Sequence, residues 1–194
     1  MQQKIDKQTI VNGFKTSQLG SLIENLRTHP EAGHVKFRCQ THWQNGARAF
    51  HRFSGYHIDG NAVHEDGRRF VVLSDEPLEF GASDAAPAPA EQLLGALAGC
   101  IAATTNAFAS LEHIRLTQLV VNVEGNLNLQ GMFALQDTVP IGFKNIQVKV
   151  AISGAASEDA LGKLAESGFQ YSPVRNTLNH GVEVKLRVKL EATG

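Results

Sequence analysis

The segment PAPAEQLLGALAGCIAATTNAFASLEH, residues 87–113, decides how the rest of the chain is interpreted. Its 20 residues from Gln92 to Leu111 carry no charge, which is the nominal length of a membrane span. Six of them are alanine and only six are Leu, Ile or Phe, so the segment suits the core of a soluble protein better than a lipid bilayer. We expect a buried helix from about Ala90 to Glu112, whose small residues let another element approach its backbone closely.

The composition is that of a folded protein without bulk charge. Of 194 residues, 42% are hydrophobic, enough for a core, and 19% are charged, a low fraction that indicates a surface covered by other chains. A net charge of -1 excludes binding to nucleic acid through bulk positive charge. The two cysteines, Cys39 and Cys100, are too few for a disulfide scaffold and fit a reducing cytoplasm. No apolar run follows the N-terminal lysines, so we expect no signal peptide.

The region before this helix predicts a helical lead-in followed by an antiparallel sheet. Residues 1–33 contain one amphipathic stretch, which Thr16 or Ser17 can cap and which Pro30 stops. From Val35 the apolar residues alternate with polar ones, which is typical of strands.

The region after the helix predicts a strand–helix–strand unit, so the fold class is α+β. Ile, Val and Ala alternate with polar residues over 146–152, Ser157 and Gly168 can cap the two ends of a helix, and Val182–Leu190 alternates cleanly. No linker or repeat interrupts the chain. We therefore expect one domain, residues 1–194, with its core over 34–192.

The hairpin around Asn45-Gly46 leaves the position of two arginines open. In a two-residue type I′ turn, Arg48 falls opposite Trp43 and Arg52 falls opposite Cys39. Both arginines then lie on the inner face, where we expect Cys39 in the core. A bulge or a slip of one residue reverses the faces and sends both arginines to solvent.

Cysteine chemistry is the remaining candidate for an active site. The eight histidines have no helical metal-ligand spacing, and no glycine-rich loop follows a strand, so the sequence predicts neither a metal site nor a cofactor. Cys100 lies about ten residues into its helix, too far for the helix dipole to activate it. Arg48 and Arg52 are the candidates for that role; without an activator, Cys100 is a small core residue.

The motifs around the central helix resemble the signature of the OsmC/Ohr family. They are Asp75-Glu76-Pro77, Gly81-Ala82-Ser83-Asp84, the run from Pro87 to Cys100, and Ser172-Pro173-Val174 where the family has Cys-Pro-Val. The resemblance covers about Val35 to Leu190. It implies an intertwined α+β homodimer in which two long central helices pack inside wrapped sheets and the active sites lie at the subunit interface.

The resemblance also implies a chemistry, because the best-known members are thiol peroxidases that act on organic hydroperoxides. Cys100 matches the cysteine that attacks the peroxide, but Ser172 stands where a second cysteine would close a disulfide. Ala90 stands where the family has a glutamate. Glu91, one residue later, faces about 180° away from Cys100 and fits an acid in the first helical turn. The family's arginine has no secure counterpart other than Arg48 or Arg52.

Two functions follow from this incomplete match. In the first, Cys100 reduces a hydroperoxide and an external thiol resolves the sulfenic acid, without a disulfide inside the chain. In the second, the dimer is not catalytic and takes part in a stress response. Its interface pocket, lined by Leu94, Leu97, Phe108 and Phe169, then holds a small apolar or lipid-like ligand, and the membrane has no part in either function.

Overall fold

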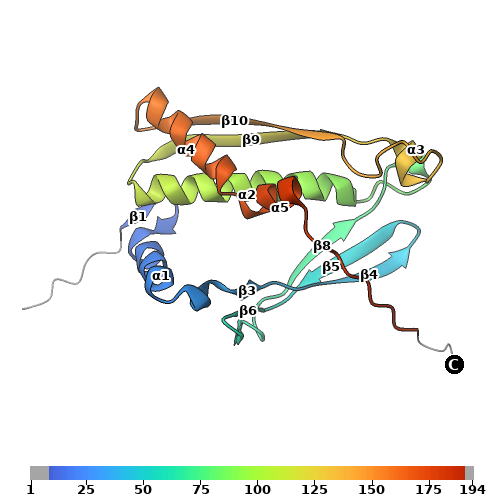
Figure 1. The fold of residues 1–194 in the computed structure, drawn as a ribbon, viewed down its shortest axis with the longest axis horizontal. Coiled ribbons are helices and arrows are strands. Elements are labelled where there is room, and N and C mark those ends of the chain that lie inside the picture. Colours follow the sequence, from blue (N-terminus) through green and yellow to red (C-terminus); the bar gives the residue numbers. More distant parts are fainter. Residues whose placement is uncertain (1–8, 191–194) are drawn as a thin grey trace, which may run out of the picture.

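A computed structural model describes residues 9–190 and confirms the mixed α+β architecture (Figure 1). The ends of the predicted lead-in and core, residues 1–8 and 191–192, lie outside the described residues. The strands are β1 (Ile10–Val11), β2 (Phe14–Lys15), β3 (Val35–Lys36), β4 (Cys39–Asn45), β5 (Arg48–Phe53), β6 (Tyr56–Ile58), β7 (Asn61–Val63), β8 (Phe70–Ser74), β9 (Leu116–Asn126) and β10 (Asn145–Gly154). The helices are α1 (Thr16–Thr28), α2 (Pro89–Leu111), α3 (Leu129–Met132), α4 (Glu158–Gln170) and α5 (Pro173–His180).

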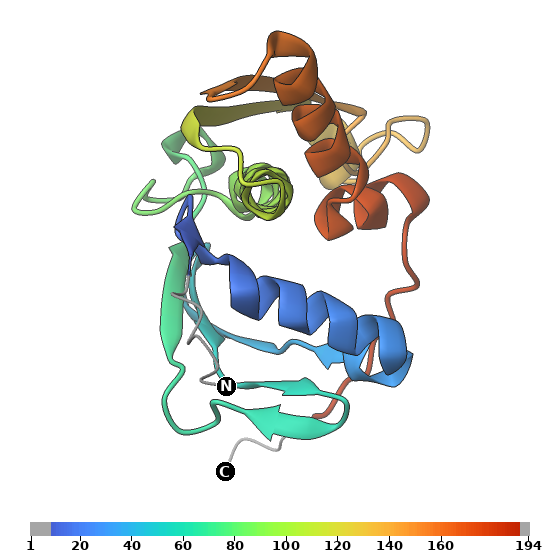
Figure 2. The same ribbon diagram turned by 90° about the vertical axis from the view of Figure 1, so that its left-hand side faces the viewer.

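The strands form small antiparallel sheets in two separate layers. One layer is the long β9–β10 pair, and the other contains the sheets β4-β5-β8 and β3-β6-β7. Helix α2 runs between the two layers, α4 lies between it and β10, and α5 packs against α2 and α4 (Figures 1 and 2). By length and composition alone α2 could cross a membrane, but in this fold it is the element on which the β9–β10 layer packs.

Helices α2 and α4 cross in close contact. Ile101 is completely buried on α2, and Leu161 and Leu164 are buried on α4. The prediction that Gly168 ends this helix is wrong, because α4 continues to Gln170. Gly168 instead lets the helices touch, since a Cβ atom built on it would lie 2.7 Å from the Cβ atom of Thr105.

The predicted lead-in helix is confirmed as α1, but its predicted caps are wrong. Lys15 is the N-cap residue and makes no capping hydrogen bond, while the Thr16 hydroxyl donates to the carbonyl of Thr9 at 3.0 Å. The β1–β2 turn anchors this region to the main fold, because Asn12 donates to the Ile114 carbonyl at 2.8 Å and accepts from the Leu116 amide at 3.0 Å.

A bulge just before the turn of the β4–β5 hairpin settles the register that the sequence had left open. Arg52 pairs with Gln40 and Cys39 pairs with Phe53, so Arg52 and Cys39 lie on opposite faces of the sheet. Arg52 is exposed, as the bulged alternative requires, and Arg48 is half-exposed. The prediction of a buried Cys39 is wrong: its side chain is exposed, because no described element covers its face.

The strand predicted over Val182–Leu190 does not form within the single chain. The segment is extended, without assigned structure, and its alternating side chains point into solvent, with Val184 and Leu190 both 89% exposed. A strand needs a neighbour to satisfy its backbone groups, and no described strand of this chain lies in register with it. The periodicity is therefore that of a strand, although the segment belongs to no sheet of the described chain.

Candidate functional site

Cys100 lies at the middle of α2, at the margin of the helix's buried face. Its neighbour Ile101 is fully buried, and one step of 100° around the helix brings Cys100 to a half-buried position. The thiol is free and makes no hydrogen bond to any described residue; the Thr104 hydroxyl bonds only to the Cys100 carbonyl, at 2.9 Å. Cys100 is thus a partly accessible thiol on the central element of the fold.

Ser172 begins the short helix that lies beside the middle part of α2 (Figures 1 and 2). Its side chain is completely buried, and its hydroxyl accepts a hydrogen bond from the Arg175 amide at 3.2 Å. The Ser172 carbonyl accepts from the amide of Asn176 at 3.0 Å. Ser172, at the start of the Ser-Pro-Val motif, is therefore a helix cap.

Arg175 is a residue of this region that the sequence analysis missed. Its guanidinium carbon lies 4.7 Å from the centre of the Phe169 ring, and one Nη atom donates to Asn176 at 3.4 Å. Its Nε–H is buried and has no hydrogen-bond partner among the described residues. In the sequence Arg175 directly follows the Ser-Pro-Val motif, which could have drawn attention to it. Its nearness to α2 follows only from the packing of α5 on that helix.

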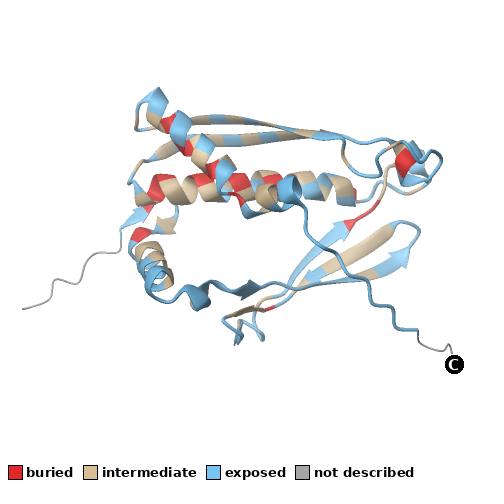
Figure 3. Ribbon diagram, in the orientation of Figure 1, coloured by how far each residue is buried: buried red, intermediate tan, exposed pale blue. Residues whose placement is uncertain are grey.

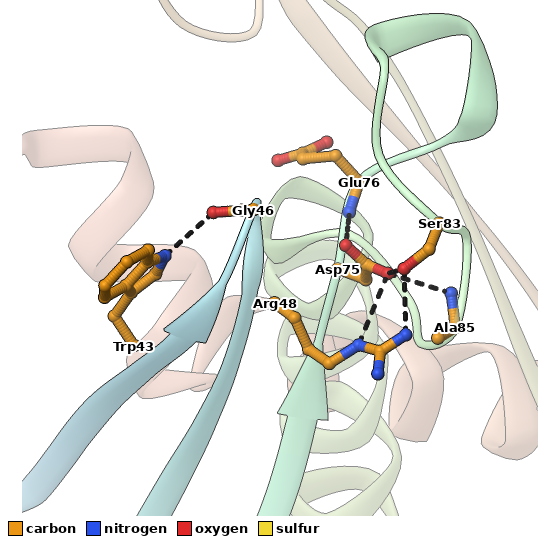
Figure 4. A network of polar contacts seen from close by, with 7 residues as sticks. All are labelled: Trp43, Gly46, Arg48, Asp75, Glu76, Ser83 and Ala85. Carbon is orange, nitrogen blue, oxygen red and sulfur yellow. Dashed lines mark hydrogen bonds and ion pairs between the residues drawn. The ribbon is translucent and has the colours of Figure 1, made fainter.

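Arg48 is held in a polar network at the loop that leads into α2 (Figure 4). It donates to the Ser83 hydroxyl at 2.9 Å, and its Nε atom lies 3.9 Å from a carboxylate oxygen of Asp75. Asp75 is buried and accepts from the Ser83 hydroxyl at 2.5 Å and from the Ala85 amide at 3.1 Å. The Ser83 hydrogen bond, followed by that of Ala85, lowers the pKa of Asp75 below its usual range.

Neither predicted arginine contacts Cys100 within the described part of the single chain. Arg48 is engaged with Asp75, and the Arg52 guanidinium lies over the Phe50 ring at 5.0 Å. Both arginines belong to the layer on the other side of α2 from β9–β10.

Glu91 has the local role expected of an acid in the first turn of a helix. Its carboxylate accepts from the Ala88 amide at 2.8 Å, so it satisfies one of the free amides at the helix start. The side-chain amide of the neighbouring Gln92 donates to the carbonyls of Leu73 at 2.6 Å and Pro87 at 3.0 Å, which ties this end of α2 to β8.

The four residues predicted to line a ligand pocket are distributed over α2 and α4. Leu97 is buried, Phe108 packs against the core cluster at α4, Phe169 lies under Arg175, and Leu94 is half-buried. A cavity of about 940 Å³ at the β4-β5-β8 sheet is lined by other side chains, among them Phe37, Cys39 and Phe70. Within residues 9–190, no group of three His, Cys, Asp or Glu side chains is placed to hold a metal ion.

The family model for OsmC-like proteins matches residues 81–187, which is more than half of the chain. The chain therefore belongs to the OsmC-like family. No curated protein matches its sequence.

Solved structures support the same assignment of the fold. An OsmC-like protein from Mycoplasma pneumoniae is 20% identical, with a TM-score of 0.57 over 75% of this chain and 89% of the other. An organic hydroperoxide resistance protein OsmC from Legionella pneumophila is 18% identical, with a TM-score of 0.52 over 77% and 93%. A putative osmotic stress induced and detoxification response protein from Psychrobacter arcticus is 13% identical, with a TM-score of 0.52 over 72% and 85%.

Proposed function

We propose that this protein is a one-cysteine thiol peroxidase that reduces organic hydroperoxides through Cys100. The observation that carries the proposal is a free, half-buried cysteine at the middle of the central helix α2, against which α5 also packs. The solved relative from Legionella pneumophila, which has the same fold, is described as an organic hydroperoxide resistance protein and a predicted redox protein. A cytoplasmic location fits the two free thiols and would supply the reductant.

The first step transfers one oxygen atom to Cys100. The thiolate attacks the terminal oxygen of R–O–O–H, an S–O bond forms, the O–O bond breaks, and the leaving alkoxide takes a proton to become an alcohol. Cys100 is oxidised by two electrons to a sulfenic acid and the hydroperoxide is reduced by two.

An external thiol must then reduce the sulfenic acid. A first thiol forms a mixed disulfide with Cys100 and releases water, and a second thiol releases reduced Cys100 and a small-molecule disulfide. Ser172 has no sulfur and is occupied as a buried cap, so it cannot take the place of the external thiol.

The proposal includes a homodimer, which the exposed surface of the single chain supports. This surface is 14,659 Å², whereas a compact monomer of this length exposes about 9,000 Å². On α2, the face turned away from the core is made of exposed small residues, and a Cβ atom at Gly95 or Gly99 would meet no atom within 4 Å. A second central helix fits this face, and the extended Val182–Leu190 segment, which belongs to no sheet of the described chain, fits a sheet edge of the second copy.

In such a dimer the reactive site would lie at the subunit interface, and the activating arginine has two sources. Arg175 lies on the helix beside α2 and has a free, buried donor. Arg48 or Arg52 would come from the N-terminal sheet of the second copy. A guanidinium beside Cys100 favours the thiolate over the thiol.

The test is the consumption of cumene hydroperoxide by the purified full-length protein with dithiothreitol as reductant. We expect Cys100→Ser to lose the activity and Cys39→Ser, which removes the exposed thiol, to keep it. Peptide mass spectrometry after one equivalent of peroxide should find the added oxygen on Cys100. Wild-type turnover that survives in Cys100→Ser, or the absence of turnover in the wild type, would overturn the proposal.

A second function, ligand binding without turnover, is favoured by a specific set of contacts. The residues that best match the family's glutamate, second cysteine and arginine in sequence all have structural roles here. Glu91 and Ser172 cap helices, and Arg48 holds the loop before α2. The ligand would then be a small apolar or lipid-like molecule at the predicted pocket. Native mass spectrometry of the purified protein tests it: a co-purified ligand that Leu97→Trp removes would support binding, and a ligand-free spectrum would oppose it.

A further inference from the structure

Arg175 differs from the other charged side chains on the elements that pack most extensively against α2, which are α4, β9 and α5. It is half-buried, and its Nε–H is buried without a hydrogen-bond partner among the described residues. The remaining charged or titratable residues of these elements are all exposed: Glu124, Glu158, Asp159, Lys163, Glu166 and His180. Helix α1 has less contact with α2 and carries only the exposed pair of Glu24 and Arg27. Arg175 is therefore the cation of these elements that can meet a group on α2.

No anion of the described chain balances the charge of Arg175. Its guanidinium lies over the Phe169 ring at 4.7 Å, and its hydrogen bond to the Asn176 side chain is long, at 3.4 Å. A charge held away from water is costly unless an opposite charge accompanies it. An anion beside the orphan Nε–H would remove that cost and would accept a charge-assisted hydrogen bond.

The start of α5 places Arg175 beside the middle of α2. The Tyr171 ring lies edge-on to the Phe108 ring of α2, with 5.7 Å between their centres, and the next residue, Ser172, is completely buried. From there α5 runs along α2 toward the N-terminal half of that helix, which contains Cys100 (Figure 1). Arg175 follows Ser172 by three residues, so it lies on the same side of α5 as that buried side chain.

Cys100 is the group on α2 that can supply the missing negative charge. It is the one ionisable side chain in the run from Gln92 to Leu111. Its side chain is half-buried, and the thiol is free and has no hydrogen-bond partner among the described residues. Two adjoining helices thus each carry a group without a partner, a cationic donor on α5 and an ionisable thiol on α2.

We infer that Arg175 of the same chain, and not an arginine of a second copy, stabilises Cys100 as a thiolate. The thiol gives its proton to water, and the guanidinium then donates to the sulfur. The inference rests on the proposed function, because it names the residue that prepares Cys100 for that reaction. It also separates activation of the thiol from dimer formation, since both partners belong to one chain.

The experiment measures the rate at which iodoacetamide alkylates Cys100 in the reduced full chain at pH 7 and at pH 10, resolved by peptide mass spectrometry. Only the thiolate reacts, and at pH 10 an ordinary thiol is largely ionised. The ratio of the two rates therefore follows the fraction of Cys100 that is thiolate at pH 7. We expect Arg175→Met to lower this ratio by about tenfold, and Arg175→Lys, which keeps a positive charge, to lower it less.

Two controls separate this effect from general ones. Cys39 is an exposed thiol in the same molecule, and its ratio should not change in either variant of Arg175. Arg115→Met removes an exposed arginine just before β9 and should leave the ratio of Cys100 unchanged. An equal fall in Arg115→Met would mean that the overall charge of the protein sets the reactivity, which would overturn the inference.

Two further results would overturn it. Equal falls in Arg175→Met and Arg175→Lys would mean that Arg175 acts only through its packing on Phe169. A fall on dilution of the wild-type protein to monomers would mean that the activating group comes from a second copy. Alkylation needs no hydroperoxide, so a fall in Arg175→Met supports this inference even if no hydroperoxide is reduced, whereas turnover without such a fall overturns this inference alone.

Discussion

The two layers on either side of α2 have similar apolar content but very different packing. In the layer of β9–β10 and α4, Ala109 of α2 forms a core with Leu161 and Leu164 of α4, and Ile101 of α2 is also completely buried. In the N-terminal layer, apolar strand residues face solvent, and Trp43 is 72% exposed. Figure 3 shows the contrast: buried residues are concentrated along α2 and α4, while the N-terminal sheets are mostly exposed.

One half of this fold therefore buries its apolar side chains within the single chain, and the other half leaves many of them exposed. Burial of apolar side chains is the main source of stability, so a layer with exposed valines and aromatic residues contributes little by itself. A second copy that covers the small-residue face of α2 and pairs with Val182–Leu190 would supply the missing burial. We call the N-terminal layer the open half and the layer of β9–β10 and α4 the closed half, and we expect substitutions in them to have different effects.

The largest expected effect concerns the open half, through the double substitution Val184→Asp and Leu186→Asp. If a second copy buries this face, each position loses about 1.5–3 kcal/mol of burial, so the pair should convert a dimer into monomers. Light scattering with size exclusion measures the change. The control is Lys185→Gln with Arg187→Gln, on the other side of the same segment, and this variant should stay dimeric. A monomeric wild type would show that no second copy covers the open half.

The next effect belongs to the closed half, in which Ile101 is completely buried. Ile101→Ala should lower the free energy of unfolding by about 2–5 kcal/mol, because it leaves a cavity where a completely buried side chain was. Val35→Ala, at a residue of β3 that is 46% exposed, should cost less than about 1 kcal/mol. Urea denaturation at low protein concentration measures both, and equal losses would mean that the two layers are equally packed.

A smaller effect is expected at the helix crossing. Gly168→Ala should destabilise the protein by about 1–3 kcal/mol, since the added methyl group meets Thr105. Gly162→Ala is the matched control on the same helix, where a Cβ atom meets nothing within 4 Å, and it should stabilise by about 0.5–1 kcal/mol. The opposite order of the two melting temperatures would show that the crossing is looser than described.

The smallest effect is a pH dependence at the loop that joins the open half to α2. The pKa of Asp75 is lowered, first by the Ser83 hydroxyl, so its contribution to stability is present above the usual aspartate value of 3.8 and is lost as pH falls through the lowered value. Asp75→Asn should therefore lower the melting temperature at pH 7, and the difference from wild type should narrow below about pH 4. Glu79→Gln, at an exposed carboxylate of the same loop, should show no such narrowing.

Much of the candidate site was readable from the sequence because its signals are local. The uncharged run around Cys100 predicted a long helix, and the Ser-Pro pair at Ser172 predicted a helix start; both are confirmed. The engagement of Arg48 by Asp75 and the orphan donor of Arg175 were not predicted. They depend on residues brought together from distant parts of the chain, which no periodicity encodes.

The sequence by itself determined the central helix with its thiol, the helix that Ser172 begins, and the OsmC-like signature, because helix and strand periods are properties of consecutive residues. Only the tertiary structure decided which strand faces are covered. The bulge in the β4–β5 hairpin put Arg52 and Cys39 on opposite faces, and the alternating segment Val182–Leu190 found no partner strand. Period-2 alternation marks two faces of a strand but cannot say what packs against either, since burial depends on contacts between segments far apart in the chain or in a second copy.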